Sequence, residues 1–143
     1  MAGKPNERDR PWRTNLSTGT EWEDKAGYSR AVRVGEGDTI HISGTTATNE
    51  NGEIVGEDDM YKQCTQTLEN IESALEKADA SLEDVVRTRM FVTDVDRWEE
   101  IAEAHHEFFG DVKPSTTLVE IERLVNPKML VEIEAEAVVR RER

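Results

Sequence analysis

The chain has 143 residues, enough for one domain that buries roughly two-thirds of its unfolded surface without disulfides or metals. Acidic residues outnumber basic ones by 31 to 18, and the resulting formal charge of -13 repels phosphate backbones, so we expect no nucleic-acid partner. The single cysteine, Cys64, excludes an internal disulfide framework, and no apolar run is long enough to span a membrane. We therefore predict a soluble, cytoplasmic protein.

The composition also bears on assembly and source. Hydrophobic residues make up only 36% of the chain and charged residues 34%, so the apolar residues are either concentrated in a few elements or shared between subunits, and we expect an oligomer. The basic residues are 12 arginines and only 6 lysines. An acidic, lysine-poor surface is typical of proteins that work in concentrated salt, because screening removes the self-repulsion. A halophilic source is therefore one hypothesis.

The first 25 residues show no sustained apolar period, and we predict an irregular arm over 1–25 and a folded domain over 26–143. Leu16 and Trp22 are the side chains expected to hold the later part of the arm. Residues 31–34 and 39–44 then alternate around a glycine-containing turn, which predicts a β-hairpin. Ile40 and Ile42 of the second strand are expected to face the core.

A long helix is predicted next, with Asp58 or Asp59 as its N-cap. Its apolar residues recur at gaps of three and four, the spacing of one buried stripe: Met60, Cys64, Leu68, Ile71, Leu75 and Ala78. Residues 85–93 are rich in β-branched side chains and predict a strand.

A second helix is predicted to open at a capping box formed by Asp96 and Glu99 and to end at Gly110. Its inward residues would be Trp98, Ile101, His105 and Phe108. After Pro114, three hydroxyl residues, 115–117, precede an alternating segment that predicts a strand. A last strand over 131–139 alternates apolar residues with Glu132, Glu134 and Glu136.

The predicted order β-β-α-β-α-β-β indicates an α+β domain whose two helices cover one face of a single sheet. The segment 108–122 places hydroxyl groups at the mouth of a strand. Such a position is a common one for a small-molecule site, because the sheet fixes the geometry while the loop supplies polar groups.

Histidine and cysteine give no independent site. His41, His105 and His106 have no metal-ligand spacing with one another or with Cys64, so we predict no metal site. Cys64 lies in the middle of the apolar stripe, which favours a core position over a nucleophile.

Three other groups each have a structural and a functional interpretation. Glu132, Glu134 and Glu136 either form a solvated strand face, or one of them is buried at a subunit contact, where a raised pKa would suit proton transfer. The pair Ser43 and Gly44 is either a simple turn or a place of close ligand approach. The hydroxyl residues 115–117 either form a turn or donate hydrogen bonds to a ligand.

Seven segments in this order resemble the RidA family, also called YjgF/YER057c/UK114, over roughly residues 26–139. They are residues 27–31 (GYSRA), 42–44 (ISG), 66–71 (QTLENI), 84–88 (DVVRT), 91–94 (FVTD), Pro114 and 131–135 (VEIEA). The resemblance implies a chorismate-mutase-like α+β fold with a mixed sheet, and a homotrimer with ligand pockets at the subunit interfaces. It also implies hydrolysis of reactive enamines or imines to 2-oxo acids and ammonia, as in 2-iminobutanoate/2-iminopropanoate deaminases, with no metal or organic cofactor.

In this family an arginine two residues after the proline clamps the substrate carboxylate, and the corresponding residue here is Thr116. Thr45 stands where the family has glutamine, and Ala102 where it has asparagine in the second helix. By resemblance, Glu132 is the catalytic residue that activates water. The substrate-binding residues are then Tyr28, Ser43, Gly44, Thr45, Thr116 and Thr117. Arg30 and Arg89 are two candidates for a replacement cation.

Two functions therefore stay open. The first is a hydrolase for a small imine that is not an ordinary 2-imino acid, and the second is a non-catalytic ligand-binding or regulatory trimer with the same pocket. Ribonuclease activity, sometimes attached to the family, is disfavoured by the charge of -13.

Overall fold

The computed structural model describes residues 10–141. Six strands run along this part of the chain: β1 (Arg13–Leu16), β2 (Ala31–Val34), β3 (Gly37–Thr45), β4 (Val85–Val92), β5 (Ser115–Glu120) and β6 (Val131–Arg140). Three α-helices accompany them: α1 (Glu21–Ala26), α2 (Met60–Lys77) and α3 (Trp98–Phe109).

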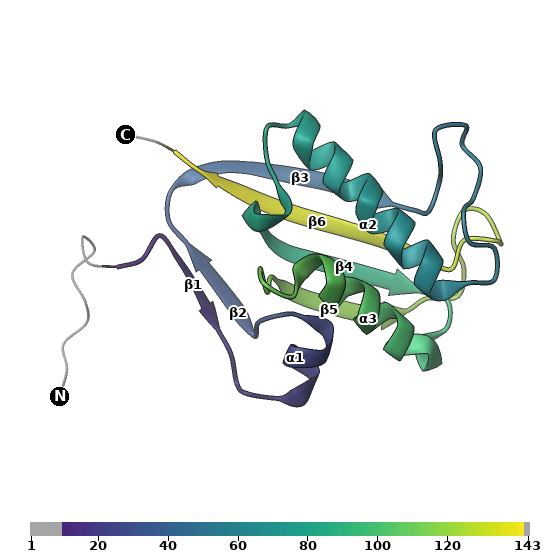
Figure 1. The fold of residues 1–143 in the computed structure, drawn as a ribbon, viewed down its shortest axis with the longest axis horizontal. Helices are drawn as coiled ribbons and strands as arrows, with labels where there is room; N and C mark the ends of the chain where they lie inside the picture. The colour runs from purple at the N-terminus through teal and green to yellow at the C-terminus, as the bar shows by residue number, and fades with distance from the viewer. Residues whose placement is uncertain (1–9, 142–143) are drawn as a thin grey trace.

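The main sheet has the strand order β3-β6-β4-β5, in which β4 and β5 are parallel and the other pairs antiparallel. Helices α2 and α3 lie side by side on one face of it (Figure 1). Because parallel neighbours need a crossover connection, α3 runs between β4 and β5. The predicted α+β class, the mixed sheet and the order of elements from residue 31 onward are confirmed.

Helix α2 forms where the periodicity predicts it. The carboxylate of Asp59 accepts a hydrogen bond from the Lys62 amide at 3.0 Å and caps the first turn. Five of the six predicted stripe residues are buried against the sheet, and the sixth, Ala78, is exposed because it is the C-cap residue after the last turn.

Helix α3 begins differently from the prediction. A 3₁₀ turn over Val95–Arg97 precedes it, and the Asp94 carboxylate caps that turn by accepting from the Asp96 amide at 3.1 Å. The predicted Asp96–Glu99 capping box is therefore wrong, because the chain tightens by one turn before the α-helix starts. Of the predicted inward residues, Ile101 and His105 are buried, whereas Trp98 and Phe108 are half-buried and the neighbouring Phe109 is buried instead. Gly110 ends the helix as predicted.

The N-terminal segment is not an irregular arm over residues 10–25, because it contains β1 and α1. The predicted hairpin is also wrong: β2 pairs with β1 in a separate two-stranded sheet, and β3 pairs with β6. The ten residues of β6 give β3 more register partners than the four residues of β2 would give. Residues 1–9, the start of the predicted arm, lie outside the described part of the chain.

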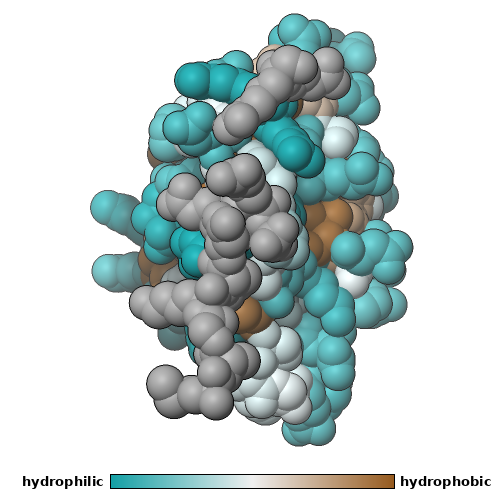
Figure 2. Space-filling view, turned by 90° about the vertical axis from the view of Figure 1, so that its left-hand side faces the viewer, coloured by the Kyte–Doolittle hydropathy of each residue, from teal (hydrophilic) through white to brown (hydrophobic). Residues whose placement is uncertain are grey.

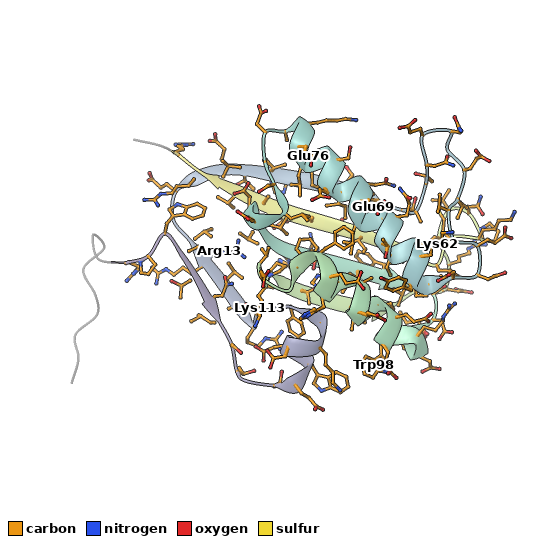
Figure 3. The ribbon with its side chains drawn as sticks, in the orientation of Figure 1. Arg13, Lys62, Glu69, Glu76, Trp98 and Lys113 are labelled. Atoms are coloured by element: carbon orange, nitrogen blue, oxygen red, sulfur yellow. The ribbon has the colours of Figure 1, made fainter. Side chains whose placement is uncertain are left out.

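Polar contacts hold the two-stranded sheet to the body. The Arg13 guanidinium donates to the carbonyl oxygens of Glu83 at 3.0 Å and Val112 at 3.2 Å, and Asn15 donates to the same Val112 oxygen at 2.9 Å (Figure 3). The Leu16 side chain is 52% exposed, so it does not anchor this segment as predicted.

Trp22 does make a contact with the body. It meets Trp98 of α3 edge-on, with ring centroids 4.8 Å apart, although it is itself 49% exposed. The rings therefore join α1 to α3 at the surface.

The hydrophobic core lies between the main sheet and its two helices. At the end of the molecule where β1 and β2 lie, the coloured surface is mostly hydrophilic, with small, separate hydrophobic areas (Figure 2). Among residues 10–141, no helix combines the length and apolar character that a membrane span requires.

Candidate functional site

The Glu132 carboxylate lies against the backbone of Gly44 on the neighbouring strand. A Cβ atom placed on Gly44 would be 2.5 Å from Glu132 Oε1, so a larger residue there would force the carboxylate out of this position. The register between β3 and β6 shifts between Ile42 and Thr45, which marks a β-bulge at Ser43 and Gly44. The structure thus brings together Gly44 and Glu132, two of the residues that the resemblance assigns to the site.

The bulge also orients its flanking polar groups. Ser43 is exposed, and its carbonyl oxygen accepts a hydrogen bond from the Thr45 hydroxyl at 2.8 Å. Thr45 is half-buried and lies opposite Ile133 of β6. Both residues are therefore near Glu132, but the Thr45 hydroxyl is already used within the bulge.

The other two glutamates of β6 have cationic partners. Arg89 Nε lies 3.1 Å from Glu134 Oε1, and its Nη2 atom lies 3.6 Å from Glu136 Oε1. His41 Nδ1 is 3.8 Å from the same Glu136 atom. Within residues 10–141, Glu132 is the one glutamate of the three without an ion pair, and Arg89 is not free to replace the missing cation.

The start of β5 forms a second group of predicted residues. The Ser29 amide donates to the Pro114 carbonyl oxygen at 3.0 Å, and Ser29 Oγ donates to the Lys113 carbonyl oxygen at 2.6 Å. These bonds, with the bridge between Ser29 and Ser115, place half-buried Tyr28 beside the strand start. Two of the segments that the resemblance assigns to the pocket, Tyr28 and residues 115–117, therefore lie close together in the chain's fold.

Thr116 and Thr117 point to opposite sides of the sheet. Thr116 pairs with Thr88 on the face that α3 covers, and its hydroxyl lies 2.6 Å from that of Thr88. Thr117 is exposed and pairs with Arg89 on the uncovered face, where Glu132 also lies. Strand β4 separates Thr116 from Glu132, so a single chain does not bring these two groups together.

His105 is the buried end of the hydrogen-bonded series that begins at Thr116. Its Nε2 atom is 2.9 Å from Thr88 Oγ1, and its Nδ1 atom is 2.6 Å from the Ala26 carbonyl oxygen. Burial lowers the pKa of His105 to about 4, so the ring is neutral at pH 7. The helical spacing predicts His105 only as an inward residue, and no sequence pattern predicts this connection.

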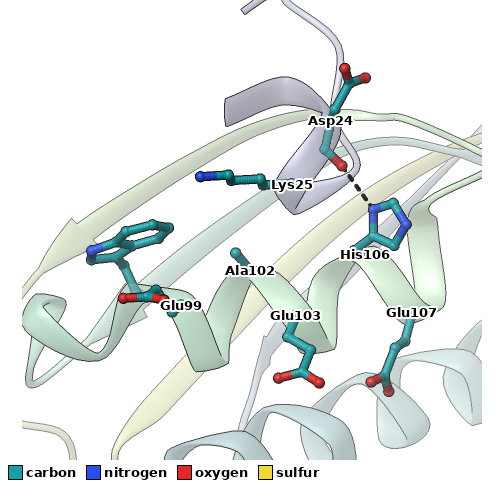
Figure 4. Close-up of a pocket in the computed structure, with 8 residues that line it drawn as sticks. Asp24, Lys25, Glu99, Ala102, Glu103, His106 and Glu107 are labelled. Atoms are coloured by element: carbon teal, nitrogen blue, oxygen red, sulfur yellow. Dashed lines mark hydrogen bonds between the residues drawn. The ribbon is translucent and has the colours of Figure 1, made fainter. Parts of the chain in front are cut away.

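A groove lies between α1 and α3, where no sequence pattern predicts a site (Figure 4). It has a volume of about 390 Å³ and is lined by Asp24, Lys25, Trp98, Glu99, Ala102, Glu103, His106 and Glu107. Lys25 Nζ lies 5.5 Å from the centre of the Trp22 ring and 5.9 Å from that of Trp98, so a cation already occupies the aromatic faces. The capping box of Thr20 and Glu23 was the available signal, because it predicts α1.

Glu23 fixes the start of α1. Its carboxylate accepts hydrogen bonds from the Thr18 hydroxyl at 2.6 Å and the Thr20 hydroxyl at 2.8 Å. These hydrogen bonds, with that of Thr18 the strongest, lower the pKa of Glu23 to about 2. Helix α1, which forms one side of the groove, is therefore capped by a carboxylate that stays ionised well below neutral pH.

Cys64 is buried, and burial raises the pKa of its thiol to about 12. The prediction that it belongs to the core is confirmed. Among residues 10–141, no three histidine, cysteine, aspartate or glutamate side chains are grouped so that they could hold a metal ion.

Comparisons with known proteins identify the family. Residues 18–139 match the model of a family described as endoribonuclease L-PSP. A RutC family protein of Pyrococcus abyssi is 39% identical over 76% of this chain and 83% of its own length. A Mycobacterium tuberculosis protein of the YjgF/YER057c/UK114 family is 46% identical over 89% of this chain and 99% of its own, with a TM-score of 0.65.

A second solved structure has a closer fold. It is the Yersinia pestis Rid family protein YyfB, which is 32% identical over 90% of this chain and all of its own, with a TM-score of 0.82. These similarities agree with the α+β architecture and with the motifs around Gly44, Pro114 and Glu132. The chain therefore belongs to the RidA (YjgF/YER057c/UK114) family.

Proposed function

We propose that this protein hydrolyses a small reactive imine, or the enamine in equilibrium with it, to a carbonyl compound and ammonia. One water molecule is consumed: its oxygen forms the C=O bond, and the nitrogen leaves as ammonia. The observation that supports this function best is the position of Glu132, whose carboxylate lies over the Gly44 backbone and has no ion pair within residues 10–141. Such a carboxylate is suited to accept a proton from the attacking water. The proposed reaction uses no metal or organic cofactor.

The site would be completed by a second copy of the chain. In one chain, Glu132 and Thr116 lie on opposite faces of the sheet, with β4 between them. On the sheet face that carries Glu132, Phe91 of β4 lies directly opposite Glu132, and Val119 of β5 lies directly opposite Phe91. Val119 is 41% exposed. We propose that this face is covered in a homotrimer, where the Glu132 group of one subunit meets the Tyr28 and Thr116 group of the next.

The proposed substrate has no carboxylate at the position that the family's arginine would bind. Thr116 occupies that position, and Arg89 is paired with Glu134 and Glu136. Loss of a charge-assisted pair typically costs a few kcal/mol of binding. Ordinary 2-imino acids should therefore be poor substrates.

Imines made in situ test the reaction and the substrate class together. An amine oxidase supplies imines without a carboxylate, and an amino-acid oxidase supplies 2-imino acids. We expect the protein to accelerate carbonyl formation from the first group, measured as lower trapping of the imine by semicarbazide. Acceleration of 2-imino acid hydrolysis to the same degree would contradict the substrate assignment. No acceleration of either group would contradict the hydrolase.

Variants of the sheet face test the proposed catalytic residue. Glu132→Gln removes the base and keeps the shape, so turnover should fall by a factor of about 10² to 10⁴. Gly44→Ala should also lower turnover, because the added methyl group displaces the carboxylate. Glu134→Gln changes a neighbouring carboxylate on the same face and should leave turnover within about twofold, since it is paired with Arg89.

A ligand-binding trimer without catalysis is the second candidate. Thr116 favours this candidate, because a neutral hydroxyl in place of the arginine guanidinium binds and orients a substrate less strongly. This candidate predicts that Glu132→Gln leaves ligand affinity unchanged and that no imine tested is hydrolysed faster.

Endoribonuclease activity is the third possibility, named by the matching family description. We propose no nucleic-acid partner, because the net charge is -13 and Arg89 of the sheet face is neutralised by two glutamates. Incubation of metal-free, highly purified protein with single-stranded RNA at low salt should leave the RNA intact. Cleavage that purifies with the protein and is lost in Glu132→Gln would overturn this proposal.

A further inference from the structure

Thr116, Thr88 and His105 form one continuous series of hydrogen bonds from the start of β5 into the core. The Thr116 and Thr88 hydroxyl oxygens are 2.6 Å apart, and the Thr88 oxygen is 2.9 Å from His105 Nε2. The other ring nitrogen, Nδ1, is 2.6 Å from the Ala26 carbonyl oxygen. His105 and Thr88 are fully buried, whereas Thr116 is half-buried, so only the Thr116 end of the series is accessible.

The direction of these hydrogen bonds follows from the carbonyl group at the buried end. A carbonyl oxygen only accepts hydrogen bonds, so His105 Nδ1 must carry a hydrogen. The neutral ring has only one N–H, because burial lowers the pKa of His105 far below 7, and Nε2 is therefore an acceptor. The Thr88 hydroxyl then donates to Nε2 and, having a single hydrogen, accepts from Thr116.

This direction determines what Thr116 offers to a ligand. Its only hydroxyl hydrogen points inward to Thr88, so the outward side of the oxygen carries lone pairs. We propose that Thr116 is a specificity-determining hydrogen-bond acceptor, which selects ligands that present an N–H or O–H group there and rejects carboxylates. The inference rests on the proposed function for the location of the ligand, because that function places Thr116 in the pocket.

Thr116 therefore offers the ligand a hydrogen-bond acceptor where an arginine would offer donors. A guanidinium has five N–H donors and no acceptor, which suits a carboxylate. Here a carboxylate oxygen would meet another oxygen with no hydrogen between them. An imine N–H, an amine or an amide would instead donate to Thr116, and the series behind it would hold the hydroxyl in place.

The protonation of His105 can be tested without any ligand. In a His41→Gln/His106→Gln variant, His105 is the only histidine, and ¹⁵N NMR at pH 7 reports its ring nitrogens separately. We expect a protonated Nδ1 and an unprotonated, hydrogen-bonded Nε2. A proton on Nε2 at pH 7 would reverse the series and overturn the proposal, whether or not the protein hydrolyses imines.

Three small ligands of the same shape test the selectivity: propanamide, 2-butanone and propanoate. The first presents an NH₂ donor where the second has a methyl group and the third an anionic oxygen. Binding is measured from chemical-shift changes of the backbone amides of residues 115–117, which are present in the parent protein and in every variant below. We expect propanamide to bind about tenfold more tightly than either of the others, the effect of roughly one hydrogen bond. If propanamide shows no such advantage, including no binding at all, the proposed acceptor role is wrong.

Substitutions connect the selectivity to the hydroxyl series. Thr116→Val has nearly the same shape without the oxygen, and it should abolish the preference for propanamide over 2-butanone. Thr116→Ser keeps the hydroxyl and should retain the preference. Thr88→Val removes the inward acceptor, so the Thr116 hydrogen can turn outward, and 2-butanone should gain affinity relative to propanamide. Unchanged selectivity in a folded Thr88→Val variant would contradict the role of the series.

Discussion

At the scale of single residues, two buried threonines have opposite hydrogen-bond environments. Thr88 is bonded to His105 and Thr116, whereas the hydroxyl of Thr67, in the middle of α2, has no hydrogen-bond partner within residues 10–141. Both side chains are fully buried. An unsatisfied buried hydroxyl lowers stability, while a satisfied one leaves its partners unpaired when it is removed.

Replacing each of these threonines by valine should therefore change stability in opposite directions. We expect Thr67→Val to raise the free energy of unfolding by about 1 kcal/mol and Thr88→Val to lower it by about 1 to 3 kcal/mol. Urea unfolding of the two variants beside the parent protein measures both changes. A loss of stability in Thr67→Val would show that its hydroxyl has a partner that the structure does not reveal.

His105 should make stability depend on pH. Burial lowers its folded-state pKa to about 4, below the unfolded value of about 6.5, so between these values the unfolded chain binds more protons. Stability is complete above pH 6.5 and is lost as the pH falls toward 4, by about 3 kcal/mol in total from this residue.

Urea unfolding at several pH values between 5 and 7 measures this dependence above the range in which most carboxylates titrate. The exposed His41 provides the control, and His41→Gln should keep the same slope. A flat free energy of unfolding over this range in the parent protein would contradict the buried, neutral state of His105.

At this scale the sequence nominates residues that the fold then brings close together. The motifs identify Gly44 and Glu132, and the structure places them in contact. The sequence does not reveal the orientation of Thr116, because the face to which a strand residue points depends on its pairing with other strands. The partnership with Thr88 and His105 joins residues 17 to 28 positions apart, and no local pattern encodes it.

At the scale of elements, predictions succeed where the signal is local and long. Helix α2 has eighteen residues with one apolar stripe and a capping aspartate, and its prediction is confirmed. The hairpin prediction fails because alternation over residues 31–34 and 39–44 shows that strands form but not which strands pair. The short β1 has only four residues, too few for a periodic signal.

The attachment of the two-stranded sheet depends on Arg13. Its guanidinium bridges the carbonyl oxygens of Glu83 and Val112, and partial burial lowers its pKa. Arg13→Ala should lower the free energy of unfolding by about 1 to 2 kcal/mol and speed hydrogen exchange of the amides that bond β1 to β2. The control is Arg33→Ala on the exposed side of β2, which should change neither quantity measurably. Equal effects of the two variants would show that the attachment does not depend on these contacts.

At the scale of the whole molecule, the charge of -13 should make stability depend on salt. Raising the ionic strength from 0.1 to 1 M shortens the Debye length from about 10 to about 3 Å and screens the repulsion between carboxylates. We expect the melting temperature to rise over this range, measured by circular dichroism in potassium chloride.

A charge variant gives the matching control. Glu69 and Glu76 are exposed on α2 (Figure 3), and changing both to lysine moves the net charge from -13 to -9, because each substitution adds two charges. The Glu69→Lys/Glu76→Lys variant should gain less from added salt than the parent protein. A melting temperature that falls with salt in the parent would contradict both the repulsion argument and the hypothesis of a halophilic source.

The buried thiol of Cys64 has a practical consequence for measuring how the molecule opens. It is the only cysteine, it lies on the buried face of α2, and burial raises its pKa to about 12, so disulfide reagents cannot reach a reactive thiolate in the closed state. The rate of its labelling therefore reports the fraction of time that the core around Cys64 is open. The chain thus carries its own single-site probe of core exposure, and a new surface cysteine can be labelled selectively without replacing Cys64.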